Sequence, residues 1–178
     1  MSASIARRIE AFKRVRDLPY RFNFLERDKD RSCATKAALL QDAFDLASRR
    51  ICCRFRWDDQ IGFPFNLLVD APMPESHHHY LEVKIPETGR WVTVDPTWDA
   101  ALRPAGFPVA EWDGLNSTPL AVRPFATFSP QQSADIVRWQ NSVSTEDWQT
   151  FNTMFGRFYR NLNTWIEQQR RPLGAFHA

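Results

Sequence analysis

Hydrophobic residues recur along this chain with two different periods, and the period separates the expected helices from the expected strands. At residues 4–17 the apolar positions stand three or four apart, which predicts an amphipathic helix with Ser4 as its N-cap. The same spacing begins again at Cys33 and continues through Ala47, after which the polar triplet SRR ends the pattern. We therefore expect one helix near the start of the chain and a second helix that begins at Cys33.

Strict alternation of apolar and polar residues predicts strands in the middle of the chain. The run ICCRFRW (51–57) alternates in this way, and so do the two runs on either side of PETGR (86–90). PETGR is rich in turn-forming residues, so the two runs around it are expected to form an antiparallel hairpin. Several prolines and a glycine place residues 58–76 in loops, with one short strand at NLLV (66–69).

The last part of the chain is expected to be helical. Ser144 and Asp147 match a capping box, and a stripe of large apolar residues follows them at helical spacing. The stripe consists of Trp148, Phe151, Phe155, Phe158, Leu162 and Trp165. Such a stripe is typical of the core or of a partner-facing groove and not of a cofactor site, and this helix is the candidate contact of an oligomer.

The composition is that of an ordinary globular domain. Hydrophobic residues make up 43% of the chain and charged residues 25%, and 178 residues are enough to bury one core without disulfides or metal. Nothing in the composition divides the chain, so we expect a single domain over residues 1–178. Its core motifs lie at 30–99, a proline-rich extended loop region at 100–130 and the C-terminal helices at 131–170.

Charge and cysteine usage narrow the expected partners and compartment. The net charge is +2 and the basic residues are scattered, which argues against a nucleic-acid partner. No run approaches the roughly 20 apolar residues of a membrane span, and the first residues lack the apolar core of a secretory signal. The cysteines are odd in number and two of them are adjacent, so no disulfide framework is expected. We expect a cytoplasmic protein.

The expected hairpin brings chemical groups together on one face. When the apolar residues of both strands are buried against one core, the intervening residues meet on the opposite face. That face carries His78, Tyr80, Glu82, Trp91, Thr93 and Asp95. His78 then lies across from Asp95, or one pair diagonally away, within reach of a hydrogen bond. The alternation selects His78 over its two neighbouring histidines, whereas a hairpin shifted by one residue selects His79.

A histidine held by a carboxylate is the base of a catalytic triad, and Cys33 is the nucleophile candidate. It stands at the expected start of a helix, where backbone N–H groups and the helix dipole stabilise a thiolate and can contribute to an oxyanion hole. A zinc site built from His77, His79 and a cysteine is the competing interpretation. Its spacing lacks a paired CxxC or HxxxH pattern and no fourth ligand is evident, so we expect no metal.

Three blocks of the sequence resemble, in order, the signature blocks of the transglutaminase-like superfamily. They are DRSCATKAALLQDAFDLASRRICCRFRW, HHYLEV and WVTVDPTWD, within residues 30–99. The resemblance places Cys33 on the nucleophile, His78 on the general base and Asp95 on the orienting acid. It also places Arg54 on the arginine that commonly follows the first helix.

The sequence departs from the family pattern at several positions. Tyr80 stands at a usual Trp, His79 at a small residue, Ser32 where many relatives have Gly and Cys52 where Pro is usual. None of these changes removes a catalytic group. No acidic cluster suggests a calcium site, and the chain is too short for the additional β-domains of the animal cross-linking enzymes. It looks most like the small prokaryotic members of the family.

The resemblance implies an α+β fold with a papain-like, transglutaminase-like core. In this core a helix carrying Cys33 packs on an antiparallel sheet carrying His78 and Asp95, and the N- and C-terminal helices cover the remaining faces. The implied activity is cysteine-dependent acyl transfer on an amide or peptide bond through an acyl-enzyme. It needs no cofactor, and water is the default acceptor.

The expected substrate contacts are Tyr80, Trp98 and Trp112, and Tyr20 is a further aromatic residue that could line the cleft. The alternative to an enzyme is a binding module on the same scaffold, with an inactive triad or an occluded cleft. In that case residues 100–130 and the aromatic C-terminal helix would cover the cleft or bind a partner.

Overall fold

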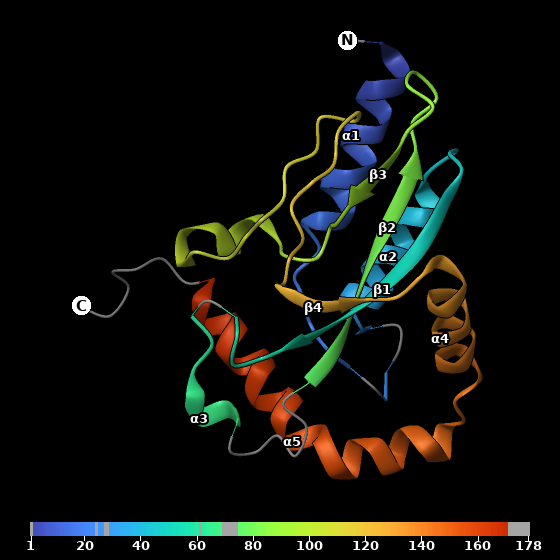
Figure 1. Ribbon diagram of the computed structural model, residues 1–178. Helices are drawn as coiled ribbons and strands as arrows, with labels where there is room; N and C mark the ends of the chain where they lie inside the picture. Colours follow the sequence, from blue (N-terminus) through green and yellow to red (C-terminus); the bar gives the residue numbers. More distant parts are fainter. Residues whose placement is uncertain (1, 24, 27–28, 61, 69–74, 171–178) are drawn as a thin grey trace.

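The computed structural model in Figure 1 describes residues 2–23, 25–26, 29–60, 62–68 and 75–170. An antiparallel four-stranded sheet with the strand order β3-β2-β1-β4 lies among helices, so the fold is α+β as predicted. The strands are β1 (Ser48–Arg56), β2 (Glu75–Lys84), β3 (Trp91–Val94) and β4 (Pro124–Thr127). The helices are α1 (Ala3–Arg16), α2 (Cys33–Ala43), α3 (Phe65–Leu68), the 3-10 helix η2 (Ala100–Ala105), α4 (Pro130–Ser142) and α5 (Thr145–Gln169).

The hairpin of β2 and β3 forms as the alternation predicts. Leu81 pairs with Val94 and Val83 pairs with Val92, and the turn includes Gly89 at positive φ. The apolar side chains of both strands pack against α1 and α2 in a cluster that we call the helix-side core. Its members include Phe12, Val15, Ala37, Leu40, Leu81, Val83, Ile85, Val92, Val94 and Trp112. The helix that begins at Cys33 therefore packs on the strand that carries His78.

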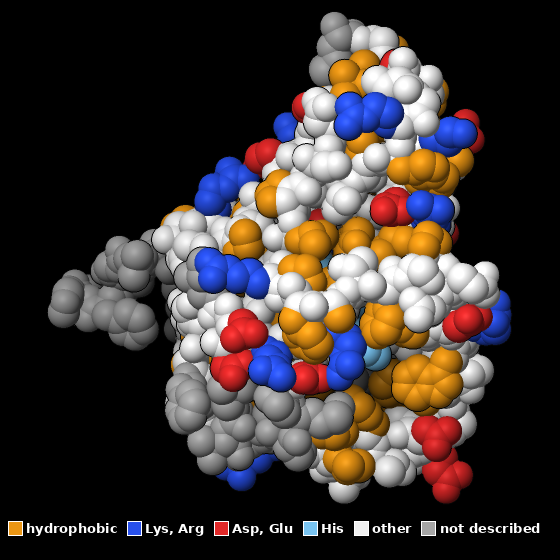
Figure 2. Space-filling model, in the orientation of Figure 1, with side chains coloured by type: hydrophobic (Ala, Val, Ile, Leu, Met, Phe, Trp, Pro, Cys, Tyr) orange, Lys and Arg blue, Asp and Glu red, His pale blue; other side chains and the backbone are white. Residues whose placement is uncertain are grey.

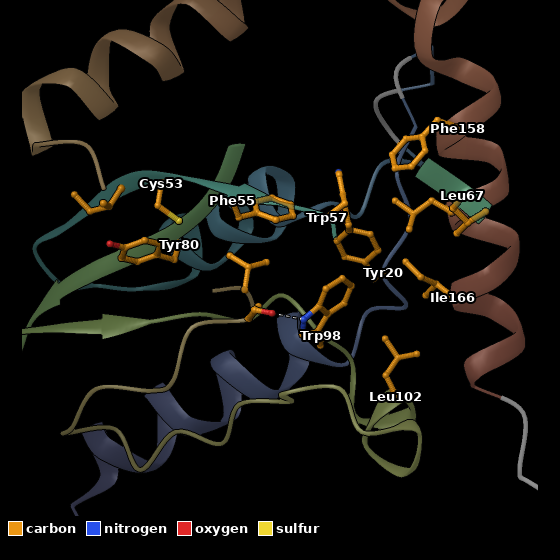
Figure 3. Close-up of a cluster of buried hydrophobic side chains, with 14 residues drawn as sticks. Tyr20, Cys53, Phe55, Trp57, Leu67, Tyr80, Trp98, Leu102, Phe158 and Ile166 are labelled. Carbon is orange, nitrogen blue, oxygen red and sulfur yellow. Dashed lines mark hydrogen bonds between the residues drawn. The ribbon is translucent and has the colours of Figure 1, made fainter. Parts of the chain in front are cut away.

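The opposite face of the sheet builds a second cluster, which we call the aromatic core. It combines Phe55 of β1, Tyr80 of β2 and Trp98 with apolar residues of α5, and Figure 3 shows α5 standing beside it. The indole Nε1 of Trp98 donates a hydrogen bond of 2.8 Å to the carbonyl of Ala121. Through this cluster the C-terminal helix is packed against side chains from the face of the sheet that also bears His78.

The start of α5 confirms the predicted capping box, because Ser144 and Asp147 hydrogen-bond each other's backbone N–H groups. The apolar stripe that follows turns inward. Phe155, Phe158 and Leu162 are buried. For these residues the stripe faces the core, one of the two alternatives that the spacing left open. No helix among the described residues is both long enough and apolar enough to cross a lipid bilayer.

Two helix boundaries differ from the expected ones. The first helix begins at Ala3, and its N-cap is Ser2, whose hydroxyl accepts the N–H of Ile5. Helix α2 ends at Ala43 and does not reach residue 47, because Phe44 adopts an extended backbone. In that conformation the ring of Phe44 packs 5.4 Å from the ring of Trp112.

The expected strand at NLLV is wrong. Asn66, Leu67 and Leu68 belong to the short helix α3, where the N–H of Leu67 donates to the carbonyl of Pro64, and Val69 lies outside the described residues. Residues 100–130 are also not loop throughout, since they contain η2 and β4. Pro124 fits β4 because this strand lies at the edge of the sheet, where a missing N–H costs no hydrogen bond.

Candidate active site

His78 and Asp95 form a buried pair at the end of the hairpin. The Nε2 of His78 lies 2.7 Å from the Oδ2 of Asp95, and both residues are almost fully buried. The same Oδ2 accepts the N–H of Ala121 at 2.7 Å, and the Oδ1 accepts the N–H of Thr97 at 3.1 Å. The N–H of Asp95 donates to the hydroxyl of Thr118 at 3.0 Å. The carboxylate is therefore fixed from three sides.

The pKa shifts of the two groups favour an ionised pair. Burial acts to raise the pKa of Asp95, but the charge and hydrogen bond of His78 outweigh it and hold the pKa below its ordinary value. Burial acts to lower the pKa of His78, but the Asp95 carboxylate and the Cys33 side chain raise it to about 10. An imidazolium beside a carboxylate follows from these two directions.

Cys33, the first residue of α2, completes the arrangement. Its side chain is one cause of the raised pKa of His78, so the two groups lie close together, and since Asp95 engages Nε2, Nδ1 is the ring nitrogen left for the thiol. Cys33 and His78 share a small cavity of about 20 Å³. The side chain of Ser32 makes no capping hydrogen bond to α2 and instead donates to Asp30 at 2.7 Å. It therefore leaves the N–H groups of the first turn of α2 uncapped.

A buried lysine links α2 to the segment that follows Asp95. The Nζ of Lys36 donates to the carbonyl of Thr97 at 2.9 Å and to the carbonyl of Arg16 at 2.8 Å. Burial is the main cause that lowers the pKa of Lys36 to about 7. The sequence analysis missed this residue. Its position three residues after Cys33, on the same helix face, was the signal that could have revealed it.

A second contact missed by the sequence analysis ties the end of α5 to the same region. Asp99 accepts the backbone N–H of Tyr20 at 2.9 Å and the guanidinium of Arg170 at 2.8 Å. Tyr20 lines the small cavity beside Cys33. This network holds Tyr20 at the cavity through partners that lie far from it in the sequence.

The histidines on either side of His78 take no part in the pair. On the other face of β2, the Nδ1 of His79 lies 3.1 Å from the Sγ of Cys52, and its Nε2 lies 3.2 Å from the amide nitrogen of Gln140. Burial lowers the pKa of His79 to about 3 and raises that of Cys52 to about 12, so both are neutral. The hairpin is not shifted by one residue. Over the described ranges, no three His, Cys, Asp or Glu side chains gather as metal ligands.

The three aromatic residues expected to contact substrate occupy different positions. Trp98 lines the small cavity with Cys33 and His78. Tyr80 is buried in the aromatic core, with its ring stacked 6.2 Å from that of His78. Trp112 packs in the helix-side core. Of the three, Trp98 is the one that borders the cavity of Cys33.

A larger groove opens beside Cys33. It has a volume of about 1130 Å³ and is walled by α2, α4, α5 and the strands β1 and β2. Figure 2 shows histidine atoms in a hollow flanked by hydrophobic side chains, on the side of α4 and α5. Cys33 lines both the groove and the small cavity, whereas His78 lines the small cavity alone. A molecule in the groove therefore meets Cys33 before it meets His78.

Comparisons of this chain with protein-family profiles, with curated proteins and with solved structures each find no match.

Proposed function

We propose that this protein is a cysteine-dependent acyl-transfer enzyme that acts on an amide or peptide bond. Cys33 is the nucleophile, His78 the general acid and base, and Asp95 the orienting acid. The observation that carries the proposal is the placement of Cys33 and His78 around one small cavity, with His78 hydrogen-bonded to Asp95. The order of the three sequence blocks supports the same roles and a papain-like, transglutaminase-like core, and the odd number of cysteines supports a cytoplasmic protein.

In the first step the Cys33 thiolate attacks the carbonyl carbon of the amide, and a tetrahedral oxyanion forms. The uncapped N–H groups at the start of α2 are the donors available to stabilise this oxyanion. The imidazolium of His78 then gives its Nδ1 proton to the leaving nitrogen. The C–N bond breaks, an amine departs, and the acyl group stays on Cys33 as a thioester.

In the second step the now neutral His78 takes a proton from water while the water oxygen attacks the thioester. The C–S bond breaks, which releases a carboxylic acid and restores the thiolate and the imidazolium. An amine acceptor would give a new amide by the same route. Water is the default acceptor because it needs no binding site of its own. Asp95 holds Nε2 throughout, so that proton exchange takes place at Nδ1.

A second candidate function is a binding module whose triad does not turn over. The observation that favours it is the enclosure of the site. His78 is 1% exposed, and the cavity that it shares with Cys33 has room for about one water molecule. In this case the groove beside Cys33 binds a partner and no acyl-enzyme forms.

Alkylation with iodoacetamide, followed by mass spectrometry of the modified peptide, separates the two candidates. We expect Cys33 to react rapidly well below about pH 8.5, where an ordinary thiol ionises. Cys52 and Cys53 are internal controls that should stay unmodified, because burial raises the pKa of each to about 12. If Cys33 is no more reactive than a free thiol, the proposal of an acyl-transfer enzyme is wrong. A reactive Cys33 that forms no acyl-enzyme with a panel of amides and peptides supports the binding module.

A further inference from the structure

The groove beside Cys33 has an apolar lining that comes from three helices. Leu39 of α2, Trp139 of α4 and Met154 of α5 all line it, and their exposed fractions are 38%, 63% and 60%. Phe151 of α5 adds an aromatic ring to the same lining. Large apolar side chains that stay in contact with water and gather on one concave surface mark a binding site.

The charged side chains of the groove are largely engaged within the protein. Glu75 forms an ion pair with Arg54. Asp147 closes the capping box at the start of α5, and Asp30 accepts the hydroxyl of Ser32. These groups have little remaining capacity to bind an ionic ligand.

Arg50 and Asp42 also line the groove, and they carry opposite charges. Burial lowers the pKa of Arg50, and the charge of Asp42 acts in the opposite direction, so the two groups lie within each other's field. A cationic or anionic ligand would therefore find its counter-charge already partly balanced. Recognition in this groove depends mainly on apolar contact.

We propose that this groove is the substrate subsite of the acyl-transfer reaction, and that its occupant is an extended peptide segment rich in aromatic and long aliphatic side chains. The inference rests on the proposed function, which places the scissile carbonyl at Cys33. The groove exceeds the roughly 300–1,000 Å³ of typical small-molecule sites, which favours several residues over a compact ligand. Met side chains adapt to varied apolar shapes, and Trp and Met are both enriched at binding surfaces, which favours a class of side chains over a single one.

Isothermal titration calorimetry with the Cys33→Ala variant tests this inference, because the variant can bind a peptide but lacks the nucleophile for acyl transfer. The probe is an acetylated and amidated peptide in which Phe and Leu alternate with Ser, and its counterpart has Ala in place of each Phe and Leu. We expect the apolar peptide to bind at least about tenfold more tightly. Trp139→Ala should remove most of this difference. Trp91→Ala, which removes an exposed tryptophan of β3 outside the groove, should preserve it.

Equal affinity for the two peptides overturns the proposal, and so does a preference that survives Trp139→Ala combined with Met154→Ser. Equally tight binding of N-acetylphenylalanine amide also overturns it, because a compact ligand would then suffice. Both replaced side chains are exposed, so the variants should stay folded, which circular dichroism checks. The two proposals can fail separately. If Cys33 proves unreactive, the acyl-transfer function is wrong but the peptide can still bind. If the peptide does not bind, the subsite is wrong but Cys33 can still be alkylated rapidly.

Discussion

The Nε2 of His78 lies 2.7 Å from the Oδ2 of Asp95, although the two residues do not stand level across the hairpin. The register pairs Leu81 with Val94, and its continuation places Tyr80 level with Asp95. The hydrogen bond is therefore diagonal, one of the two arrangements that the alternation of the strands allows. Asp95 follows the last residue of β3, and two backbone N–H groups turn its carboxylate toward the imidazole.

Asp95→Asn should slow the alkylation of Cys33 by about 100-fold or more near pH 6, and acyl transfer by a similar factor. Asparagine keeps the shape of the side chain but removes the charge that raises the pKa of His78. The ring then loses its proton more readily and no longer supports the thiolate. Rates of iodoacetamide modification measure the effect. Asp113→Asn is the control, because this carboxylate lies exposed in a loop. If Cys33 of the Asp95→Asn variant is alkylated as fast as in the wild type, the carboxylate has no role in activating Cys33.

Replacement of His78 and of its neighbour His79 by glutamine should have opposite effects on the alkylation of Cys33. His78→Gln should abolish the rapid alkylation of Cys33, because the variant has no imidazolium to support the thiolate. His79→Gln should leave the alkylation rate within about twofold of the wild type and reduce the free energy of unfolding by about 1–3 kcal/mol, since it disturbs a buried contact with Cys52. Alkylation rates and urea denaturation measure the two effects. A His79→Gln variant with unreactive Cys33 would contradict the assigned roles.

The alternation of the strands was sufficient to choose His78, because a side-chain period of two leaves each residue only two possible faces. The same argument placed the apolar residues of β2 and β3 in one core. Cys33 was likewise identified by the start of a helical pattern. These features depend on local periodicity, which a single sequence displays directly.

The features that the sequence analysis missed depend on contacts between distant segments. In the sequence Lys36 has the pattern of an ordinary polar residue within a helix. In the structure it is buried, and its Nζ donates to the carbonyls of Arg16 and Thr97, which belong to two other segments. Helix α2 ends where Phe44 adopts an extended backbone, and the ring of Phe44 packs on the distant Trp112. The groove exists because α4 and α5 fold back toward α2, and no local pattern encodes that approach.

The raised pKa of His78 predicts that stability depends on pH. An ordinary histidine has a pKa of 6.5, and in the folded protein that of His78 is about 10. Its stabilising contribution is complete below about pH 6.5 and is lost as the pH rises toward about 10. The difference in unfolding free energy between the wild type and His78→Gln should therefore shrink between about pH 6.5 and 8.5. The slope is at most about 1.4 kcal/mol per pH unit. Urea denaturation at several pH values measures it, and a constant difference would contradict the prediction.

Lys36 predicts a pH dependence of the opposite sign. Its pKa falls from 10.5 to about 7 on folding, so between these values the unfolded chain binds a proton that the folded protein lacks. Its contribution to stability therefore increases as the pH rises through this window. In the wild type this gain opposes the loss from His78, and the free energy of unfolding should change little between about pH 7 and 8.5.

Lys36→Met should remove the opposing term and reveal a stability that declines with pH, by up to about 1.4 kcal/mol per pH unit. Methionine is similar in length and suits a buried position, but it leaves the carbonyls of Arg16 and Thr97 without their donor, which costs about 1–3 kcal/mol for each group. Urea denaturation at several pH values measures both effects. Lys29→Met is the control, because Lys29 is exposed and its substitution should leave the profile flat. A Lys36→Met profile as flat as that of the wild type would show that the two groups do not oppose each other.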